Sequence, residues 1–331
     1  MKIDFHCHAF PGGFFRAAKH FYPDLIELGH DEEKRLLATW AGTTLPAWDH
    51  AGRLADIDRA GIDLEILSCP PVYSRIDEHA PELCRLVNDA IAAACHRDPR
   101  RFGGFAHLPF NNMTLALQEM RRALDELGFV GVLVTSNIGG RYLDSAEYYP
   151  FWEEANRRGV PVFMHPSNSP CYRDDQPGPL LSFPFDTTLS VYKLIYGGLY
   201  ERFPDIILVV AHLGGTLPFL ARRTDLVFDV PGFFPGIKQP ARRPSEWMRK
   251  LYVDTALGWN RGAFNCAREL VSLDHIVFGT DYFVRSTRFM EWTIEFIDGL
   301  GLTASEREMI YENNARQILR LGPELIWRPL P

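Results

Sequence analysis

The sequence lacks the features that mark membrane-spanning, exported or nucleic-acid-binding proteins. No apolar run approaches the roughly 20 residues that a membrane-spanning helix needs. The formal net charge is −7, and no Lys- and Arg-rich stripe offers a surface for a nucleic acid. The chain starts with Met1-Lys2-Ile3-Asp4 instead of a basic and then apolar leader, so no export signal is predicted. We therefore expect a protein that engages neither membranes nor nucleic acids.

Cysteine pairs and domain linkers are missing as well. The six cysteines are scattered without a Cys-x-x-Cys spacing, which argues against a disulfide framework and favours a reducing cytoplasm. No Ser- and Gly-rich linker divides the 331 residues, and a hydrophobic content of 46% is enough for one large core. These observations predict a single cytoplasmic domain over residues 1–331.

Short strand-like runs alternate with helical patterns along nearly the whole chain, which is the pattern of a parallel sheet covered by helices. The predicted strands are 2–6, 63–68, 102–108, 131–135, 160–165, 206–212, 250–255 and 275–280. The predicted helices are 49–60, 81–97, 114–127, 148–158, 187–203, 217–226, 262–272 and 288–300, with an extra C-terminal helix over 305–321. Loop insertions over 9–48 and 166–182 follow strands one and five.

Eight strands, each followed by a helix, predict an α/β fold of the (β/α)8 TIM barrel type. An open dinucleotide-binding sheet would carry Gly-x-Gly-x-x-Gly after its first strand, and here that place holds His6-Cys7-His8. Barrels build their sites at the C-terminal ends of their strands, where both insertions also start. We expect the functional residues at that end.

His6 and His8 stand at the end of the first predicted strand, after the apolar Ile3 and Phe5. Side chains alternate between the faces of a strand, so both imidazoles point the same way and Cys7 points the other. Two imidazoles on one face can bind one metal ion with little ordering of the chain.

Other strands end in residues of the same chemical kind. His165 follows strand five, His212 follows strand six and Asp281 follows strand eight. A catalytic site for one Zn²⁺ uses about three nitrogen or oxygen ligands and leaves one position open. We therefore predict His6, His8, His165 and Asp281 as the ligands of one divalent ion, Zn²⁺ before Mn²⁺. His212 is the predicted acid/base, and Asp281 is predicted to be catalytic as well as a ligand, since it would take up a proton in a hydrolysis.

Strand four predicts how many ions are bound. Barrels with two metals bridge them with a Lys or a carboxylate at the end of strand four, where this chain reads Thr135-Ser136-Asn137. No bridging ligand stands there, so one ion is expected. Cations in the loops after strands eight, five and four, namely Arg285, Arg173 and Arg141, are candidates for holding a substrate carboxylate. His107 ends strand three and is a further candidate for the pocket.

Short motifs that include these residues occur along nearly the whole chain. They are Ile3-Asp4-Phe5-His6-Cys7-His8, Trp48-Asp49, Met164-His165-Pro166, Glu201-Arg202-Phe203-Pro204, Ala211-His212-Leu213-Gly214-Gly215, Pro244-Ser245-Glu246, Tyr252-Val253-Asp254-Thr255, Phe278-Gly279-Thr280-Asp281-Tyr282 and Glu312-Asn313-Asn314-Ala315. With them the sequence resembles the amidohydrolase superfamily, in its amidohydrolase-related branch that contains aminocarboxymuconate semialdehyde decarboxylase. The resemblance implies a single Zn²⁺ bound by His6, His8, His165 and Asp281, with His212 as the catalytic histidine.

This branch contains non-oxidative decarboxylases of muconate-type and hydroxybenzoate acids, and hydrolases of lactones and of C–C bonds. The resemblance therefore implies a metal-dependent decarboxylase of a small unsaturated or aromatic carboxylic acid. Hydrolysis of a C–C, lactone or related carbonyl bond at the same site is the alternative, because both reactions use the same residues. Members of the branch commonly pair, so a homodimer is possible, and the aromatic stretch 228–234 is a candidate interface.

Overall fold

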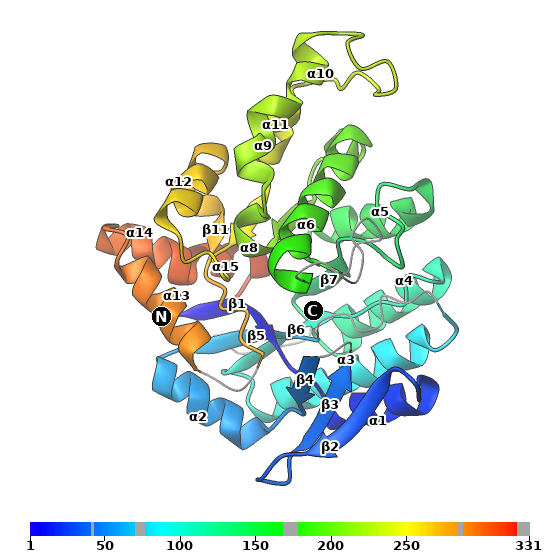
Figure 1. Ribbon diagram of the computed structural model, residues 1–331, viewed down its shortest axis with the longest axis vertical. Coiled ribbons are helices and arrows are strands. Elements are labelled where there is room, and N and C mark those ends of the chain that lie inside the picture. Colours follow the sequence, from blue (N-terminus) through cyan, green and yellow to red (C-terminus); the bar gives the residue numbers. More distant parts are fainter. Residues whose placement is uncertain (41–42, 70–76, 168–177, 284–286, 323–331) are drawn as a thin grey trace.

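Eight parallel strands form the centre of the protein in a computed structural model that describes residues 1–40, 43–69, 77–167, 178–283 and 287–322. Neighbouring strands follow the order of the chain. They are β1 (Ile3–His8), β5 (Leu64–Ser68), β6 (Phe102–Ala106), β7 (Gly131–Thr135), β8 (Pro161–His165), β9 (Ile207–Val210), β10 (Tyr252–Asp254) and β11 (Ile276–Val277). Helices surround these strands, as Figure 1 shows, and the predicted (β/α)8 barrel is confirmed.

The helices alternate with the strands in the expected way. Up to β9 they are α2 (His50–Ala60), α3 (Ala80–Arg97), α4 (Met113–Arg121) with the π turn η1 (Arg122–Glu126), the 3₁₀ turn η2 (Ala146–Tyr148), α5 (Tyr149–Arg158), α6 (Gly178–Tyr196) and α7 (Leu199–Arg202). Beyond β9 they are α8 (Ala211–Gly214), α9 (Leu217–Thr224), α10 (Leu226–Asp229), α11 (Pro244–Met248), α12 (Arg261–Leu270), the 3₁₀ turn η3 (Leu273–His275), α13 (Arg288–Asp298), α14 (Ala304–Glu308), the π turn η4 (Met309–Asn313) and α15 (Asn314–Leu319). Gly61 and Gly159 end α2 and α5 in the left-handed conformation that glycine adopts without strain. Among the helices of the described residues, none has both the length and the apolar composition needed to span a bilayer.

The barrel closes between its last strand and its first. The amide of Phe5 donates to the carbonyl of Phe278 at 2.9 Å, and the amide of His8 donates to the carbonyl of Tyr282 at 2.8 Å. In the other direction, the amide of Asp281 donates to the carbonyl of His6 at 2.8 Å. Backbone hydrogen bonds therefore set Asp281 beside the two histidines of β1.

Apolar side chains fill the barrel below its C-terminal end. Phe5, Phe105 and Phe163 meet there with ring centroids 5.0 to 5.6 Å apart. They belong to one core cluster with residues of α15, whose Ala315 and Ile318 are buried in it. This aromatic floor excludes water from beneath the strand ends, so polar side chains above it lie in a medium of low dielectric constant.

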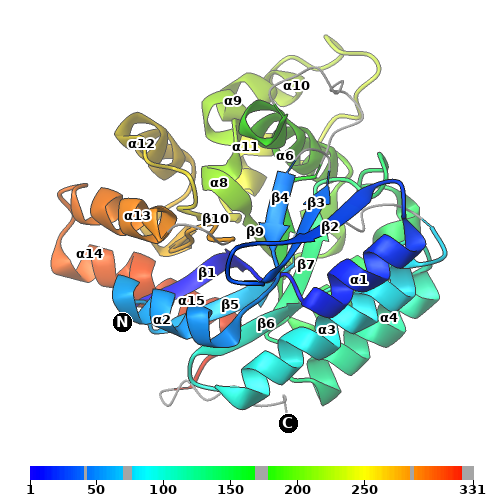
Figure 2. The ribbon, with the colours of Figure 1, turned by 60° about the horizontal axis from the view of Figure 1, so that its bottom comes forward.

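The first insertion corrects the expectation of a loop. It contains α1 (Gly12–Phe21) and an antiparallel sheet of β2 (Ile26–His30), β3 (Leu36–Trp40) and β4 (Thr43–Pro46), which Figure 2 shows beside α1. These strands bury one residue each, Ile26, Ala38 and Pro46, so they lack the apolar alternation by which strands are recognised in a sequence.

Two predicted helices differ from those observed. The helix predicted over 187–203 starts earlier, at Gly178 inside the second insertion, and is interrupted at Gly198, whose φ of 79° is left-handed. The C-terminal helix predicted over 305–321 is divided by the π turn η4 into α14 and α15. Its apolar periodicity continues through the π turn, so periodicity alone did not indicate the division.

Candidate active site

A β-bulge in β1 turns both of its histidines into the barrel. Asp4 pairs with Glu65 and Cys7 pairs with Leu67, so Phe5 and His6 together lie opposite the single residue between those partners. Phe5 belongs to the core inside the barrel, whereas Cys7 packs in the outer core. The bulge thus lets Phe5 supply the floor while the next residue, His6, still faces the site.

The other histidines and the aspartate come from strand ends around the same mouth. His165 is the last residue of β8, and His212 and Asp281 follow β9 and β11. His212 and Asp281 have φ values of 59° and 56°, a conformation that costs a residue with a side chain on the order of 1–3 kcal/mol. Such strain is retained where the surrounding structure fixes a functional position.

Hydrogen bonds assign the same tautomer to three imidazoles. The hydroxyl of Ser68 donates to the carbonyl of Cys7 at 3.0 Å, so its oxygen accepts from Nδ1 of His8 at 2.9 Å. Nδ1 of His165 donates to the carbonyl of Pro166 at 2.8 Å. Nδ1 of His6 bonds to a carboxylate, Asp254, at 2.7 Å. Each ring therefore commits its Nδ1 hydrogen to a protein group, and in its neutral form it presents an Nε2 lone pair.

The Nε2 atoms converge on the carboxylate of Asp281. Its Oδ1 lies 2.9 Å from Nε2 of His8 and 3.2 Å from Nε2 of His6, and the two Nε2 atoms are 3.2 Å apart. One ligand-type atom each from His6, His165, His212 and Asp281 lies within 4.8 Å of the others. Lone pairs at such distances repel one another unless a proton or a metal ion lies among them. His8 reaches the same Asp281 oxygen, and imidazole nitrogens with a carboxylate oxygen are a donor set that suits Zn²⁺ or Mn²⁺.

The electrostatics of the cluster also favour a cation. Burial opposes the charged form of His6, but the carboxylates of Asp254 and Asp281 outweigh burial and raise the pKa of His6 to about 10. Burial lowers the pKa of His8 to about 4 and holds the pKa of His165 well below its usual value. Burial alone would raise the pKa of Asp281, yet the adjacent His6 holds it well below its ordinary range. The cluster therefore holds a positive charge between two buried carboxylates.

His212 stands at the edge of this cluster. Its Nε2 lies 3.4 Å from Oδ2 of Asp281, the oxygen that does not face the β1 histidines. Its side chain is 10% exposed, against 0% for His6 and 2% for His8. His212 is thus near enough to exchange a proton with Asp281 and is open to an incoming molecule.

Of the other predicted residues, Arg141 and His107 are described, and neither is a member of this cluster. Arg141 is largely exposed, and its guanidinium lies 3.5 Å from the carboxylate of Glu147. His107 is fully buried, where its Nε2 accepts the amide of Cys69 at 2.9 Å and its Nδ1 lies 3.1 Å from Oδ1 of Asn88. Burial lowers the pKa of His107 to about 3. Arg173 and Arg285 lie outside the described residues.

Two residues at strand ends, Asp254 and Ser68, received no role in the sequence analysis. Asp254 is the last residue of β10 and Ser68 the last of β5, and both bond to Nδ1 of a β1 histidine. Their position, the same as that of His165 on β8, was a signal that could have identified them. Neither residue type indicates a metal centre when its partner is unknown.

A second acidic cluster lies in the barrel wall behind β1. Asp4, Cys7 and Glu65 each offer a ligand-type atom there. Nε of the buried Arg53 lies 2.7 Å from Oε2 of Glu65, and its guanidinium stacks 4.3 Å from the ring centroid of Tyr282. An arginine inside the cluster supplies the positive charge, so we assign this group to barrel structure and not to metal binding.

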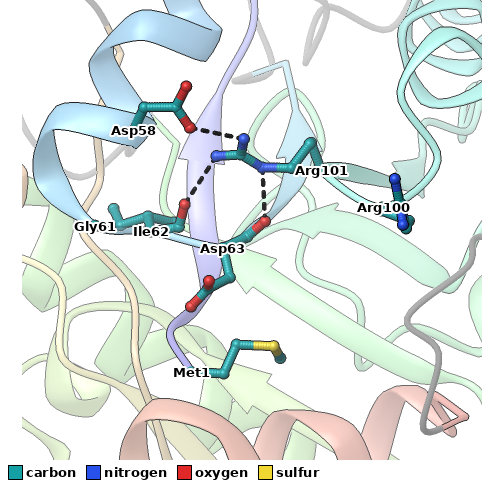
Figure 3. A pocket seen from close by; sticks show the side chains of 7 residues that line it. All are labelled: Met1, Asp58, Gly61, Ile62, Asp63, Arg100 and Arg101. Carbon is teal, nitrogen blue, oxygen red and sulfur yellow. Dashed lines mark hydrogen bonds and ion pairs between the residues drawn. The ribbon is translucent and has the colours of Figure 1, made fainter.

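A hollow of about 370 Å³ opens near the starts of β1 and β5, and Figure 3 shows the residues that line it. Arg101 spans it, with its guanidinium 2.7 Å from Oδ1 of Asp58 and donating to the carbonyls of Ile62 and Asp63 at 3.0 and 2.9 Å. These bonds connect the end of α2 to the start of β6. They give Arg101 a structural role.

The fold and the site define a TIM barrel with a metal-type centre of histidines and aspartate at its C-terminal end. A family model described as Amidohydrolase matches residues 3–321, and the chain therefore belongs to the amidohydrolase family.

Several proteins similar to this chain are decarboxylases by name. The chain is 29% identical over 337 residues to 2-amino-3-carboxymuconate-6-semialdehyde decarboxylase of Dictyostelium discoideum, covering 98% of this chain and 92% of the relative. A solved 2,6-dihydroxybenzoate decarboxylase complexed with 2,6-dihydroxybenzoate is 26% identical, with a TM-score of 0.79 over 97% of this chain and 99% of that one. A dihydroxybenzoic acid decarboxylase from Polaromonas sp. JS666, solved with manganese and the inhibitor 2-nitroresorcinol, is 25% identical, with a TM-score of 0.79 over 99% of both chains.

Proposed function

We propose that this protein is a non-oxidative decarboxylase that removes CO₂ from a small aromatic or unsaturated carboxylic acid with the help of one divalent metal ion. The observation that carries the proposal is the convergence of the His6, His8 and His165 imidazoles on the Asp281 carboxylate at the barrel mouth. The decarboxylase relatives support the same reaction class.

His6, His8, His165 and Asp281 are the proposed ligands. A divalent ion bound there would offset the negative charge of an acidic substrate and orient it. Imidazole nitrogens favour Zn²⁺ by ligand type, and the manganese in a relative makes Mn²⁺ the competitor. Because Zn²⁺ generally outcompetes Mn²⁺ at such ligands, turnover of the metal-free protein reloaded with each ion separately distinguishes them.

His212 is the proposed acid. Its imidazolium would donate a proton to the ring or chain carbon that bears the carboxylate, and the bond between that carbon and the carboxylate would then break. The electron pair of the broken bond returns to the substrate, CO₂ leaves, and His212 regains its proton from solvent. Oδ2 of Asp281 lies 3.4 Å from Nε2 of His212 and can hold the ring in place by a hydrogen bond.

The test follows the products. Metal-free protein reloaded with Zn²⁺ or Mn²⁺ is incubated with a panel of acids that includes 2,6-dihydroxybenzoate, and released CO₂ is measured together with the organic product. One CO₂ is expected for each molecule of decarboxylated acid, and none in the presence of a chelator. A second organic acid without CO₂ would instead establish hydrolysis and overturn the proposal.

A cytoplasmic location and a homodimer stay predictions. Phe233 and Phe234, in the stretch 228–234, are 67% and 40% exposed, which agrees with an apolar contact surface. Sedimentation velocity measures whether the chain pairs in solution.

A further inference from the structure

We propose that Asp254 is a positioning residue that fixes His6 and His212 relative to each other. The inference builds on the proposed function, because it assumes that His6 binds the metal and that His212 moves a proton. It concerns a residue to which neither the motifs nor the relatives assigned a role.

The two oxygens of Asp254 bond to different parts of the site. Oδ2 lies 2.7 Å from Nδ1 of His6. Oδ1 accepts the backbone amide of His212 at 2.8 Å and that of Ala256 at 3.0 Å. One rigid carboxylate therefore sets both the ring of a proposed ligand and the backbone of the proposed acid.

The surroundings restrict the movement of the Asp254 side chain. Asp254 is fully buried, and a Cβ at Gly279 would lie 3.1 Å from its Cβ. Asp254 accepts the backbone amide of His212, whose φ of 59° is left-handed. This conformation is strained for a histidine, so the hydrogen bond stabilises it. A rotation of the carboxylate would release His6 and the His212 turn together.

The negative charge of Asp254 matters as well as its shape. A carboxylate that accepts the Nδ1 hydrogen makes the opposite Nε2 a stronger donor to a metal, and it excludes the tautomer whose hydrogen would block the site. Ser68 and the Pro166 carbonyl accept from His8 and His165 as neutral groups. His6 is thus the imidazole most strongly polarised toward the cation.

The nearly isosteric substitution Asp254→Asn separates charge from packing. An asparagine has one acceptor oxygen and one NH₂ group, so an N–H group must face either Nδ1 of His6 or the amides of His212 and Ala256. In the first case His6 changes tautomer and loses its free Nε2. In the second case the left-handed turn loses its acceptor.

The experiment measures metal affinity by competition with a chromophoric chelator, in parallel with kcat. Asp254→Asn is expected to bind Zn²⁺ about 10- to 100-fold more weakly than the wild type. Asp254→Glu keeps the carboxylate and is expected to recover part of this loss. The matched control is Asp225→Asn, a buried carboxylate that bonds to the amide and hydroxyl of Ser245 and contacts none of the site histidines, and its affinity should equal that of the wild type.

A second measurement uses the wild type, so its result does not depend on whether a variant folds. In Zn²⁺-loaded protein labelled with ¹⁵N-histidine, the Nδ1 hydrogen bonded to Asp254 should resonate furthest downfield among the site histidines, because its acceptor is charged. Wild-type affinity in Asp254→Asn, or ring N–H signals without a distinct downfield member, would overturn the role of Asp254. A wild type that binds no divalent metal would instead overturn the proposed function.

Discussion

The three imidazoles His6, His8 and His165 are the residues on which the site depends most directly. Each commits Nδ1 to a protein group, Asp254, Ser68 or a backbone carbonyl, and so turns Nε2 to one centre. The tautomers follow from single hydrogen bonds, since a serine hydroxyl has one hydrogen and a carbonyl has none. The site is therefore organised for a cation before any ion binds.

His212 can be tested apart from these ligands. His212→Asn removes the imidazole and retains a residue that tolerates positive φ, so the turn after β9 should persist. We expect kcat to fall by about 10²- to 10⁴-fold because the acid is lost, with the metal content unchanged. Assays of turnover and of bound metal on the same preparation check this prediction.

The control for that variant is His275→Asn, whose ring stacks on Tyr252 and bonds to the Leu251 carbonyl away from the site. It should keep both activity and metal. If His212→Asn lost the metal instead, His212 would be a ligand, and the assigned division between ligands and acid would be wrong.

Sequence reasoning identified side chains whose position at a strand end already implies where they point. His6, His8, His165, His212 and Asp281 all belong to this kind, and the structure brings them together, while their roles stay predictions. Asp254 and Ser68 could not be assigned because their roles depend on which nitrogen of a distant imidazole they face. The positions of the candidate substrate contacts could not be predicted in the same way. Those of Arg141, Arg173 and Arg285 depend on the paths of loops, and that of His107 depends on the shape of the pocket wall.

At the scale of elements, the junction of β1 and β11 decides the geometry of the site. β1 carries the bulge, and the chain after β11 closes against it through backbone hydrogen bonds at Phe5, His6 and His8. Alternation along β1 correctly placed His6 and His8 on one face, but the inward position of Phe5 follows from the bulge, for which the sequence carries no distinct signal. The number and order of the barrel strands could be predicted because short apolar runs alternate with helical segments along the chain.

The substitution Gly279→Ala tests the importance of this junction. A Cβ there would lie 2.8 Å from Cβ of His6, so Gly279→Ala must push β1 away from the chain after β11. We expect a destabilisation of about 1–3 kcal/mol and a loss of metal affinity, because His6 and Asp281 separate. Thermal unfolding and chelator competition measure the two effects.

Gly29→Ala is the matched control, since a Cβ at that position in β2 meets nothing within 4 Å. It should leave metal affinity unchanged. Equal affinity and equal Tm for Gly279→Ala and the wild type would contradict the account of the junction.

At the scale of the whole molecule, the barrel joins residues from opposite ends of the chain around one centre. β1 and the chain after β11 are adjacent only because eight strands close, and the aromatic floor beneath them keeps water from the lower side. The closed order of strands was predictable from the alternation of strands and helices. The sheet inside the first insertion was not, because its strands bury too few residues to leave a pattern.

The most direct test of the account is an anomalous difference map from crystals of the protein loaded with Zn²⁺. The account predicts one peak per chain, about 2.0–2.2 Å from Nε2 of His6, His8 and His165 and from a carboxylate oxygen of Asp281. No peak at the barrel mouth, or two peaks there, would contradict the single metal centre on which the proposed chemistry depends.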